Sequence, residues 1–457
     1  MNKFWGSRFE GQTDSLADKF SYSISYDYRL AKYDCIGGIA HAKMLGKCQI
    51  ISKKDADAIV SGLQKLLKQI EDGKFKYDPK AEDIHTNVQS ELKKLIGAPA
   101  DKLHTARSRN DLIVLDMKLY CRDELIALIK EITNIQKAAV KFAEKNKDVI
   151  IPAYTHLQAA QVVLLAHHML AYVEMLERDK TRLQDALKRI DVNPLGSCAL
   201  SGSSLPTDRA YVSKLLGFKE TAANSIDAVS DRDFIVETLS GLAIFGMHSS
   251  RIAEDMIVWA TSEFNFVDID WSLCTGSSIM PHKKNPDIME LIRGESAKLY
   301  SNLMEILVLT KGLPLTYNRD LQLDKPPLFE SIEKANDIGG LLTKLFGTLK
   351  VKKDVLSKRV QDESFFTVDV MEYLITKGVS YREAHDTVGL MVKNCLDKGI
   401  SLTELNKKDL QKFSPNFDED VKKLLKPETS VKIKQSLGST RPAFVAQQIQ
   451  KWKKRLK

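Results

Sequence analysis

Apolar residues recur at three- and four-residue steps over most of the chain, the spacing that lines one face of an α-helix. From Asp111 to about Asn146 they surround much of the helix circumference, at Leu112, Ile113, Leu115, Leu119, Ile126, Ile129 and Ile132. A helix that is apolar on most sides is typical of one buried among neighbours. The pattern therefore predicts a long helix inside a bundle.

The spacing of Gly and Pro indicates how long the other helices are. Neither residue occurs between Pro99 and Pro152, or between Pro152 and Pro194. Stretches of this length without a breaker hold helices well above the average length. The same periodicity predicts helices over 160–190, 234–263, 287–311 and 328–357, the last interrupted by Gly339-Gly340 and Gly347. Strand-like alternation is scarce.

These patterns predict an all-α fold. We expect a central bundle of long helices over residues 106–360, flanked by smaller helical domains at 1–105 and 361–457. A chain of 457 residues is long enough to bury a core and to shape a deep site.

Composition places the chain among ordinary globular proteins, with 43% hydrophobic residues, 28% charged residues and a mean hydropathy of −0.24. The first residues form no apolar leader and no stretch is long enough for a membrane span, so we expect a cytoplasmic protein. The net charge of +8 suits an anionic small substrate as well as it suits nucleic acid. The densest basic run, Lys451–Lys457, is expected to be a solvated tail.

Cysteine and histidine give no sign of a metal or cofactor. The six cysteines lie far apart without paired spacing, which indicates neither a disulfide framework nor a zinc site. The nine histidines show no ligand spacing, and no dinucleotide-binding fingerprint is present. We therefore expect no cofactor.

One polar segment stands out for its chemistry. Residues 275–286 read TGSSIMPHKKNP and lead directly into a predicted helix. Its hydroxyls offer a base or nucleophile, and Lys283 with Asn285 supplies charge and a donor for an oxyanion. An ordinary polar loop with a helix cap is the alternative, since no phosphate-binding pattern is present.

The Gly-Ser-Ser-x-Met-Pro-x-Lys-x-Asn string resembles the signature of the fumarase/aspartase superfamily of lyases. Five further segments narrow the resemblance to the argininosuccinate lyase family: Phe4–Phe9, His104–Asp111, Tyr154–Gln158, Asp227–Asp233 and Tyr317–Lys325. They occur in order and at family-like spacing, whereas the C-terminal part is less diagnostic.

The resemblance implies a reversible β-elimination that converts argininosuccinate to arginine and fumarate. Removing a proton beside an ionised carboxylate requires a positioned base and an oxyanion cradle. By resemblance, Ser277 and His156 transfer the protons, and which is base and which is acid stays open. Glu290 would orient His156, while Lys283 and the loop amides would stabilise a Ser277 alkoxide.

The resemblance also implies a set of substrate contacts and an assembly. A homotetramer is expected, with each active site built from three subunits. His85 and Thr86 are second-tier candidates for contact, and Tyr317 with Lys325 is expected at the arginine end. The main candidates are Ser23, Ser108, Arg109, Asn110, Thr155, Asn285, Tyr317, Gln322 and Lys325.

For each of these candidates a surface polar residue or a helix cap is the alternative, and for Arg109 an intrachain salt bridge is equally possible. Ala106 stands where the family commonly has Gly, and His282 where it commonly has Gln. If the backbone there requires a positive φ, Ala106 stiffens the loop.

Three other functions compete with this one. Another superfamily lyase would act on adenylosuccinate, fumarate or aspartate. A structural protein on the same scaffold would resemble the lens crystallins. A nucleic-acid-binding role rests only on net charge, because no aromatic residues are interleaved with the basic ones.

Overall fold

The computed structural model describes residues 14–457, and within them helices dominate, as predicted. The Phe4–Phe9 motif lies outside the described residues. The chain is all-α: over residues 14–457 its strands form only two-stranded sheets.

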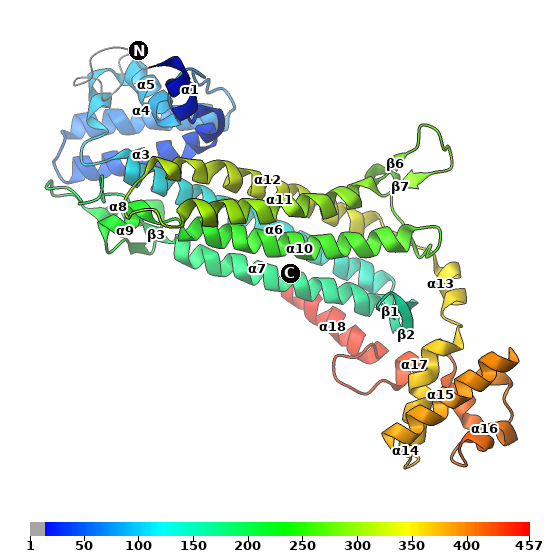
Figure 1. Cartoon of the computed structure of the whole chain (residues 1–457). Coiled ribbons are helices and arrows are strands. Elements are labelled where there is room, and N and C mark those ends of the chain that lie inside the picture. Colours follow the sequence, from blue (N-terminus) through cyan, green and yellow to red (C-terminus); the bar gives the residue numbers. More distant parts are fainter. Residues whose placement is uncertain (1–13) are drawn as a thin grey trace. The chain divides into compact units, whose positions relative to one another are not determined.

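Five long helices carry the fold (Figure 1). They are α6 (Arg109–Lys145), α7 (Leu165–Ile190), α10 (Asp233–Ala260), α11 (Asp287–Thr310) and α12 (Lys325–Thr348). The predictions for α6, α10 and α11 agree within three residues. The prediction for α7 started too early, because residues 158–164 form a strand.

Helix α12 runs without a break through Gly339-Gly340 and Gly347, so the predicted interruption was wrong. A Cβ at Gly339 would lie 2.7 Å from Cγ of Glu131 on α6. The glycine therefore permits close approach of the two helices, which Thr343 supports by donating to Glu131 at 2.8 Å.

The chain divides into two compact units, and the boundaries fall within the five long helices. The first comprises the chain up to Ile129, Thr181–Ala243 and Lys298–Ala335; the second comprises Lys130–Lys180, Ile244–Ala297 and Asn336–Lys457. The expected domain boundaries at residues 105 and 360 stay a prediction.

The first unit adds short helices to its parts of the long ones. Ser52 caps α4 by accepting from Asp55 N, and Asp83 caps α5 by accepting from Thr86 N. The fully buried Leu45, Ile59 and Leu63 join α3 to α4. The helices are α1 (Ser15–Ser21), α2 (Ile24–Asp27), α3 (Ala31–Lys47), α4 (Lys53–Glu71), α5 (Ile84–Ile96), α8 (Arg209–Leu216) and α9 (Ser225–Ser230), with 3-10 turns η2 (Tyr28–Leu30), η3 (Ala98–Lys102) and η5 (Arg319–Asp324). Strand β3 (Val192–Asn193) pairs in parallel with β4 (Glu220–Thr221).

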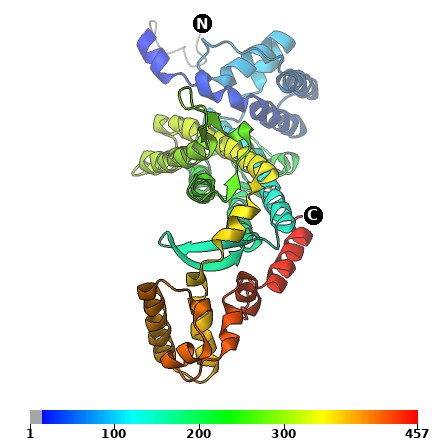
Figure 2. The same ribbon diagram turned by 90° about the vertical axis from the view of Figure 1, so that its right-hand side faces the viewer.

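The second unit contains an antiparallel hairpin of β1 (Ile150–Thr155) and β2 (Gln158–Leu164). Val162 of β2 belongs to the apolar cluster of the C-terminal helices, with Phe365, Phe366 and Leu374, so the hairpin packs against them (Figure 2). These helices are α13 (Lys353–Arg359), α14 (Thr367–Thr376), α15 (Tyr381–Lys398), α16 (Lys407–Phe413), α17 (Pro427–Ile433) and α18 (Pro442–Arg455), with 3-10 turns η6 (Glu363–Phe366), η7 (Leu402–Glu404) and η8 (Glu419–Leu424). The 3-10 turn η4 (Trp271–Leu273) precedes the Ser277 loop in the same unit. Two antiparallel pairs complete the unit, β5 (Val267–Asp268) with β8 (Lys350–Val351) and β6 (Thr275–Gly276) with β7 (Lys284–Asn285).

The basic C-terminal run is not a solvated tail, and that expectation was wrong. It forms the last turns of α18, where Trp452 is 1% exposed and donates to Glu174 at 3.1 Å. Lys453 pairs with Glu144 at 2.8 Å and Arg455 with Glu177 at 2.5 Å. Two features explain the packing. Apolar residues such as Trp452 are interspersed among the basic ones, and α7 provides the acidic partners Glu174 and Glu177.

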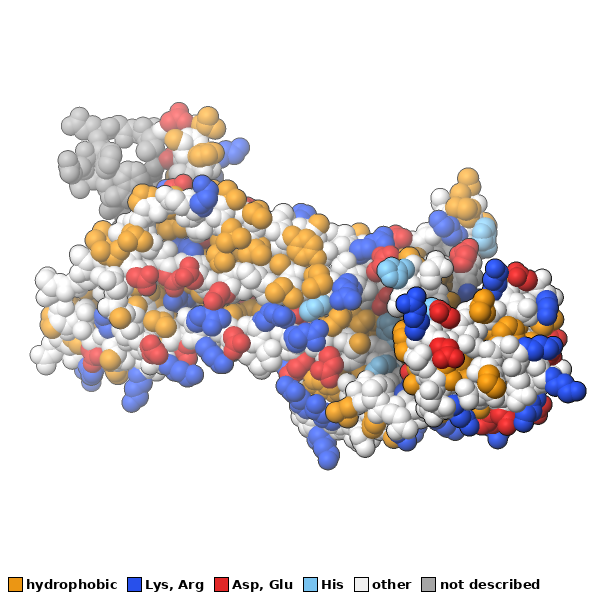
Figure 3. Space-filling view, turned by 60° about the horizontal axis from the view of Figure 1, so that its bottom comes forward, with side chains coloured by type: hydrophobic (Ala, Val, Ile, Leu, Met, Phe, Trp, Pro, Cys, Tyr) orange, Lys and Arg blue, Asp and Glu red, His pale blue; other side chains and the backbone are white. Residues whose placement is uncertain are grey.

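None of the described helices combines the length and apolarity that a membrane span needs. On the face shown in Figure 3, basic and acidic side chains are interspersed. The net charge of +8 is therefore not gathered into one patch on that face.

Three of the cysteines, Cys35, Cys121 and Cys395, are buried as free thiols.

Candidate active site

A pocket of about 220 Å³ in the first unit gathers residues from four distant segments. Six of the predicted substrate contacts line it: Ser23, Arg109, Asn110, Tyr317, Gln322 and Lys325. His85, a second-tier candidate, lines it as well. Tertiary packing thus brings together residues that are separated by up to about three hundred positions in sequence.

Asp27 holds two of these segments together. It accepts from Ser23 Oγ at 2.6 Å and from Ile84 N at 3.1 Å. It is 1% exposed, and burial raises its pKa. Sequence reasoning missed Asp27, because nothing in its local sequence distinguishes it from a residue of a helix end.

The start of α6 contributes Arg109 and Asn110. Arg109 pairs with Asp83 at 2.8 Å and donates to Thr86 Oγ1 at 2.9 Å, so the intrachain salt bridge exists and the same side chain also lines the pocket. Asn110 donates to the Ala199 carbonyl at 3.0 Å. Ser108 accepts from Asn110 N at 3.2 Å through its hydroxyl, and it does not line the pocket.

Another wall of the pocket is formed by η5 and the residues next to it. Gln322 and Arg319 donate to the Ser21 carbonyl at 2.8 and 2.9 Å, which ties this wall to the segment before Ser23. Burial raises the pKa of Tyr317. Arg319 also pairs with Glu82 at 3.2 Å and was not among the predicted contacts, although it lies in the Tyr317–Lys325 motif.

His85 lines the pocket and also belongs to a buried cluster with Asp34 and Asp116. Its Nδ1 lies 3.1 Å from Asp34 and 3.7 Å from Asp116. Burial alone would lower the pKa of His85, but the hydrogen bond to Asp34 and the charges of Asp34, Asp83 and Asp116 raise it to about 9. A histidine with two carboxylates is a set of side chains that can bind a metal ion. Here His85 Nδ1 contacts the Asp34 carboxylate directly, so the two form an ion pair.

The pocket therefore carries both signs of charge. Arg109, Arg319 and Lys325 line it together with Asp27, Glu82 and Asp83. This mixture suits a ligand that carries carboxylates together with amino or guanidinium groups.

The Ser277 loop lies in the second unit, between β6 and β7. Ser277 Oγ accepts from the backbone N–H groups of Ile279 at 3.3 Å and Met280 at 3.0 Å. Donors aimed at an oxygen favour its anionic form. Two backbone N–H groups of the loop therefore point at the Ser277 oxygen.

Two adjacent lysines of this loop differ in environment. Lys284 donates to Asp268 at 2.8 Å and lies 4.4 Å from the centroid of the Trp271 ring, which anchors the base of the loop. Lys283 is exposed, as is Glu290 in the first turn of α11, while Asn285 is half-buried in β7. Lys283 is therefore the lysine that remains available to a ligand.

His156 occupies the tip of the β1–β2 hairpin. Both His156 and Leu157 have a φ of 56°, a left-handed conformation that the two-residue turn requires. Thr155 and His156 are exposed, and Leu157 is 75% exposed. Over residues 14–457, no hydrogen bond joins His156 to Glu290, so the predicted orienting contact is not made within one chain.

The predicted residues thus divide into two sets. The lining of the first pocket comes from the first unit alone, whereas Thr155, His156, Ser277, Lys283, Asn285 and Glu290 belong to the second. None of the four best-formed pockets in residues 14–457 is lined by members of both sets.

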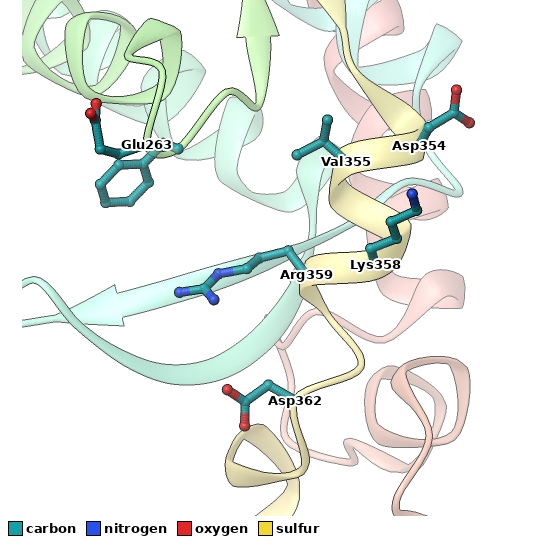
Figure 4. A pocket seen from close by; sticks show the side chains of 7 residues that line it. Glu263, Asp354, Val355, Lys358, Arg359 and Asp362 are labelled. Atoms are coloured by element: carbon teal, nitrogen blue, oxygen red, sulfur yellow. The ribbon is translucent and has the colours of Figure 1, made fainter.

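A larger pocket in the second unit, of about 570 Å³, contains none of the predicted residues (Figure 4). Lys358 and Arg359 share it with Glu263, Asp354 and Asp362. Size alone therefore does not identify the site, and the convergence of predicted groups favours the smaller pocket.

Comparison with known proteins decides the family. A family model described as Lyase matches residues 7–300, and one described as Argininosuccinate lyase C-terminal matches residues 366–432. The argininosuccinate lyase of Syntrophus aciditrophicus (strain SB) is 45% identical over 448 residues, 98% of this chain and 95% of that protein. The chain belongs to the argininosuccinate lyase family. The argininosuccinate lyase of Geotalea daltonii is 46% identical over 439 residues, 96% of each chain.

Solved structures of other lyases share the fold of this chain. EDDS lyase in complex with formate has a TM-score of 0.84 at 26% identity, covering 98% of this chain and 91% of that one. An EDDS lyase variant with bound fumarate has a TM-score of 0.83 at 26% identity, covering 98% and 90%. The family match over residues 366–432 falls in the region whose sequence motifs were least diagnostic.

Proposed function

We propose that this member of the family catalyses the reversible elimination of argininosuccinate to arginine and fumarate. The observation that carries the proposal is the convergence of Ser23, Arg109, Asn110, Tyr317, Gln322 and Lys325 on one pocket of mixed charge. A tricarboxylate with an amino group and a guanidinium-derived group is complementary to such a lining.

The chemistry is a proton transfer that precedes cleavage of the carbon–nitrogen bond. Loss of the proton beside an ionised carboxylate places a second negative charge on that carboxyl group. Ser277 and His156 are the proposed proton-transfer pair, and Ser277 is supported by the two amides that donate to its oxygen. Lys283 and Asn285 would stabilise the dianion, and the protonated arginine nitrogen leaves.

We further propose that the active site is completed by other copies of the chain in a homotetramer. Tyr300, Met304, Leu307 and Val308 follow one stripe of α11 and are 42%, 59%, 43% and 61% exposed. An exposed apolar stripe at helical spacing is typical of a surface that another subunit covers. Such an assembly would also unite the two sets of predicted residues. A cytoplasmic location stays a prediction.

The reaction is tested by the ultraviolet absorbance of fumarate when the purified protein meets argininosuccinate, with adenylosuccinate and aspartate in parallel. We expect fumarate from argininosuccinate alone. Ser277→Ala should lower kcat by at least about a hundredfold, while the matched neighbour Ser278→Ala should retain activity. Turnover of another substrate would overturn the specificity, and a folded tetramer inactive on all three would favour a structural protein.

Sharing of sites between subunits is tested by mixing two inactive variants. Lys325→Met removes a pocket group, and Ser277→Ala removes the loop hydroxyl. After subunit exchange at equal amounts, about a quarter of the sites should combine two intact halves and recover activity. No recovery despite exchange would contradict sites built from different chains.

A further inference from the structure

The Asp227–Asp233 motif contributes no residue to the pocket, yet it reaches the pocket through a buried carboxylate. Arg232, in the turn between α9 and α10, is 4% exposed. Its Nε donates to Asp324, and its Nη1 donates to the Asp231 carbonyl at 2.8 Å. Asp324 is the last residue of η5, directly before Lys325.

Asp324 is shared between two cations. One of its oxygens accepts from Arg232, and the other accepts from Lys325 Nζ at 3.0 Å. The side chains of Arg232, Asp324 and Lys325 are 3%, 0% and 3% exposed. Only Lys325 of the three lines the pocket.

Charge explains why two cations are needed. A buried Asp324–Lys325 pair alone would be neutral, and its ammonium would be committed to Asp324. With Arg232 the three groups carry one net positive charge, which reaches the pocket through Lys325. Because water screens little in such a buried site, that charge acts strongly on a bound carboxylate.

We propose that Arg232 is a positioning residue for substrate binding: by neutralising Asp324, it leaves the Lys325 ammonium positively charged toward a carboxylate of the substrate. This inference rests on the proposed function, which places the substrate in this pocket.

The surroundings of Arg232 fix its position. Lys118 pairs with the Asp231 carboxylate at 2.9 Å, and Asp231 also accepts from Asp233 N at 2.9 Å at the start of α10. The turn that carries Arg232 is thus held from two sides. Burial opposes the ionisation of Asp324, but the charges of Lys325 and Arg232 outweigh it and lower its pKa.

The test is a double-mutant cycle on charge. Arg232→Met removes the positive charge, and we expect the KM for argininosuccinate to rise about tenfold or more with a smaller change in kcat. Arg232→Met combined with Asp324→Asn restores one net positive charge, so its KM should return to within about threefold of wild type. Arg232→Lys keeps the positive charge, so its KM should also stay within about threefold of wild type. This variant preserves the test if Arg232→Met folds poorly.

Two further measurements separate an effect of charge on substrate binding from a general loss of structure. The dissociation constant of arginine, measured by calorimetry, should follow the same order as KM. Arg122→Met removes a half-buried arginine of the same unit that donates to the Leu216 carbonyl at 2.9 Å, and should leave KM unchanged. A double variant no better than Arg232→Met would overturn this inference while wild-type turnover sustains the proposed function. Absence of wild-type turnover would overturn both.

Discussion

Cys198 Sγ donates to the carbonyl oxygen of Ala106 at 3.2 Å, and the two residues share left-handed backbone, with φ of 53° and 56°. Between them Asp111 accepts from Gly196 N at 2.9 Å and Cys198 N at 2.8 Å. These contacts fix the loop that leads into α6, where Asn110 reaches the pocket. Left-handed backbone is strained for residues other than glycine.

Ala106→Gly should relieve this strain. We expect the free energy of unfolding to rise by up to about 1 kcal/mol, because glycine adopts a positive φ without steric cost. Urea unfolding measures the change. Ala127→Gly, on an exposed position of α6, is the matched control and should lower stability by about 1 kcal/mol. Equal destabilisation by both substitutions would contradict the assignment of strain at Ala106.

Substituting each of the two adjacent lysines of the Ser277 loop should have a different effect. Lys284→Met removes the bond to Asp268 and the contact with Trp271, so we expect faster proteolytic cleavage within residues 277–283. Lys283→Met leaves those contacts in place and should lower kcat without changing the cleavage rate. Limited proteolysis beside fumarate assays separates the two effects. Similar proteolysis of both variants would disprove the anchoring role of Lys284.

Stability should depend on pH through His85. Its pKa of about 9 lies above the ordinary value of 6.5, so its contribution is fully present below pH 6.5 and disappears as pH rises through 9. This contribution is at most about 3 kcal/mol. The difference in stability between wild type and His85→Gln should therefore shrink between pH 6.5 and 9.5 in urea unfolding.

The control for this pH effect is His385→Gln, whose imidazole is 68% exposed on α15. Its stability difference from wild type should be small at every pH. A constant difference for His85→Gln over the same range would mean that His85 is not held as an imidazolium.

His282→Gln should retain activity. The residue is exposed in the Ser277 loop and replaces a glutamine that is common in the family. Since its neighbours Ser277 and Lys283 carry the proposed chemistry, we expect kcat/KM within about twofold of wild type. A loss approaching that of Ser277→Ala would show that His282 takes part in proton transfer.

The helices that were predicted well are those in which local pattern and tertiary environment agree. The apolar periodicity of α6 marks a buried helix, and its residues from Leu112 to Leu119 are largely buried. Ile126 was expected inside but is 54% exposed in the single chain. Periodicity identifies an apolar face, whereas only the assembled neighbours determine what covers it.

The failures share a different cause. Gly339 looked like a helix breaker, yet α12 needs it for close approach to Glu131. Residues 160–164 looked helical because a short apolar run fits a strand as well as a helix, and pairing of β2 with β1 decided the matter. Contacts with partners distant in sequence overrode local propensity at both places.

By itself the sequence determined the all-α class, the long helices, the family motifs and most of the groups now found in the pocket, because periodicity and motif chemistry are local properties. Only the tertiary structure showed that Asp27 ties two walls together, that Arg319 lines the pocket and that Asp324 lies between Arg232 and Lys325. It also separated the anchoring Lys284 from the exposed Lys283. These roles depend on burial and on hydrogen bonds between distant segments, and the energy of a charge is set by the groups that surround it in space.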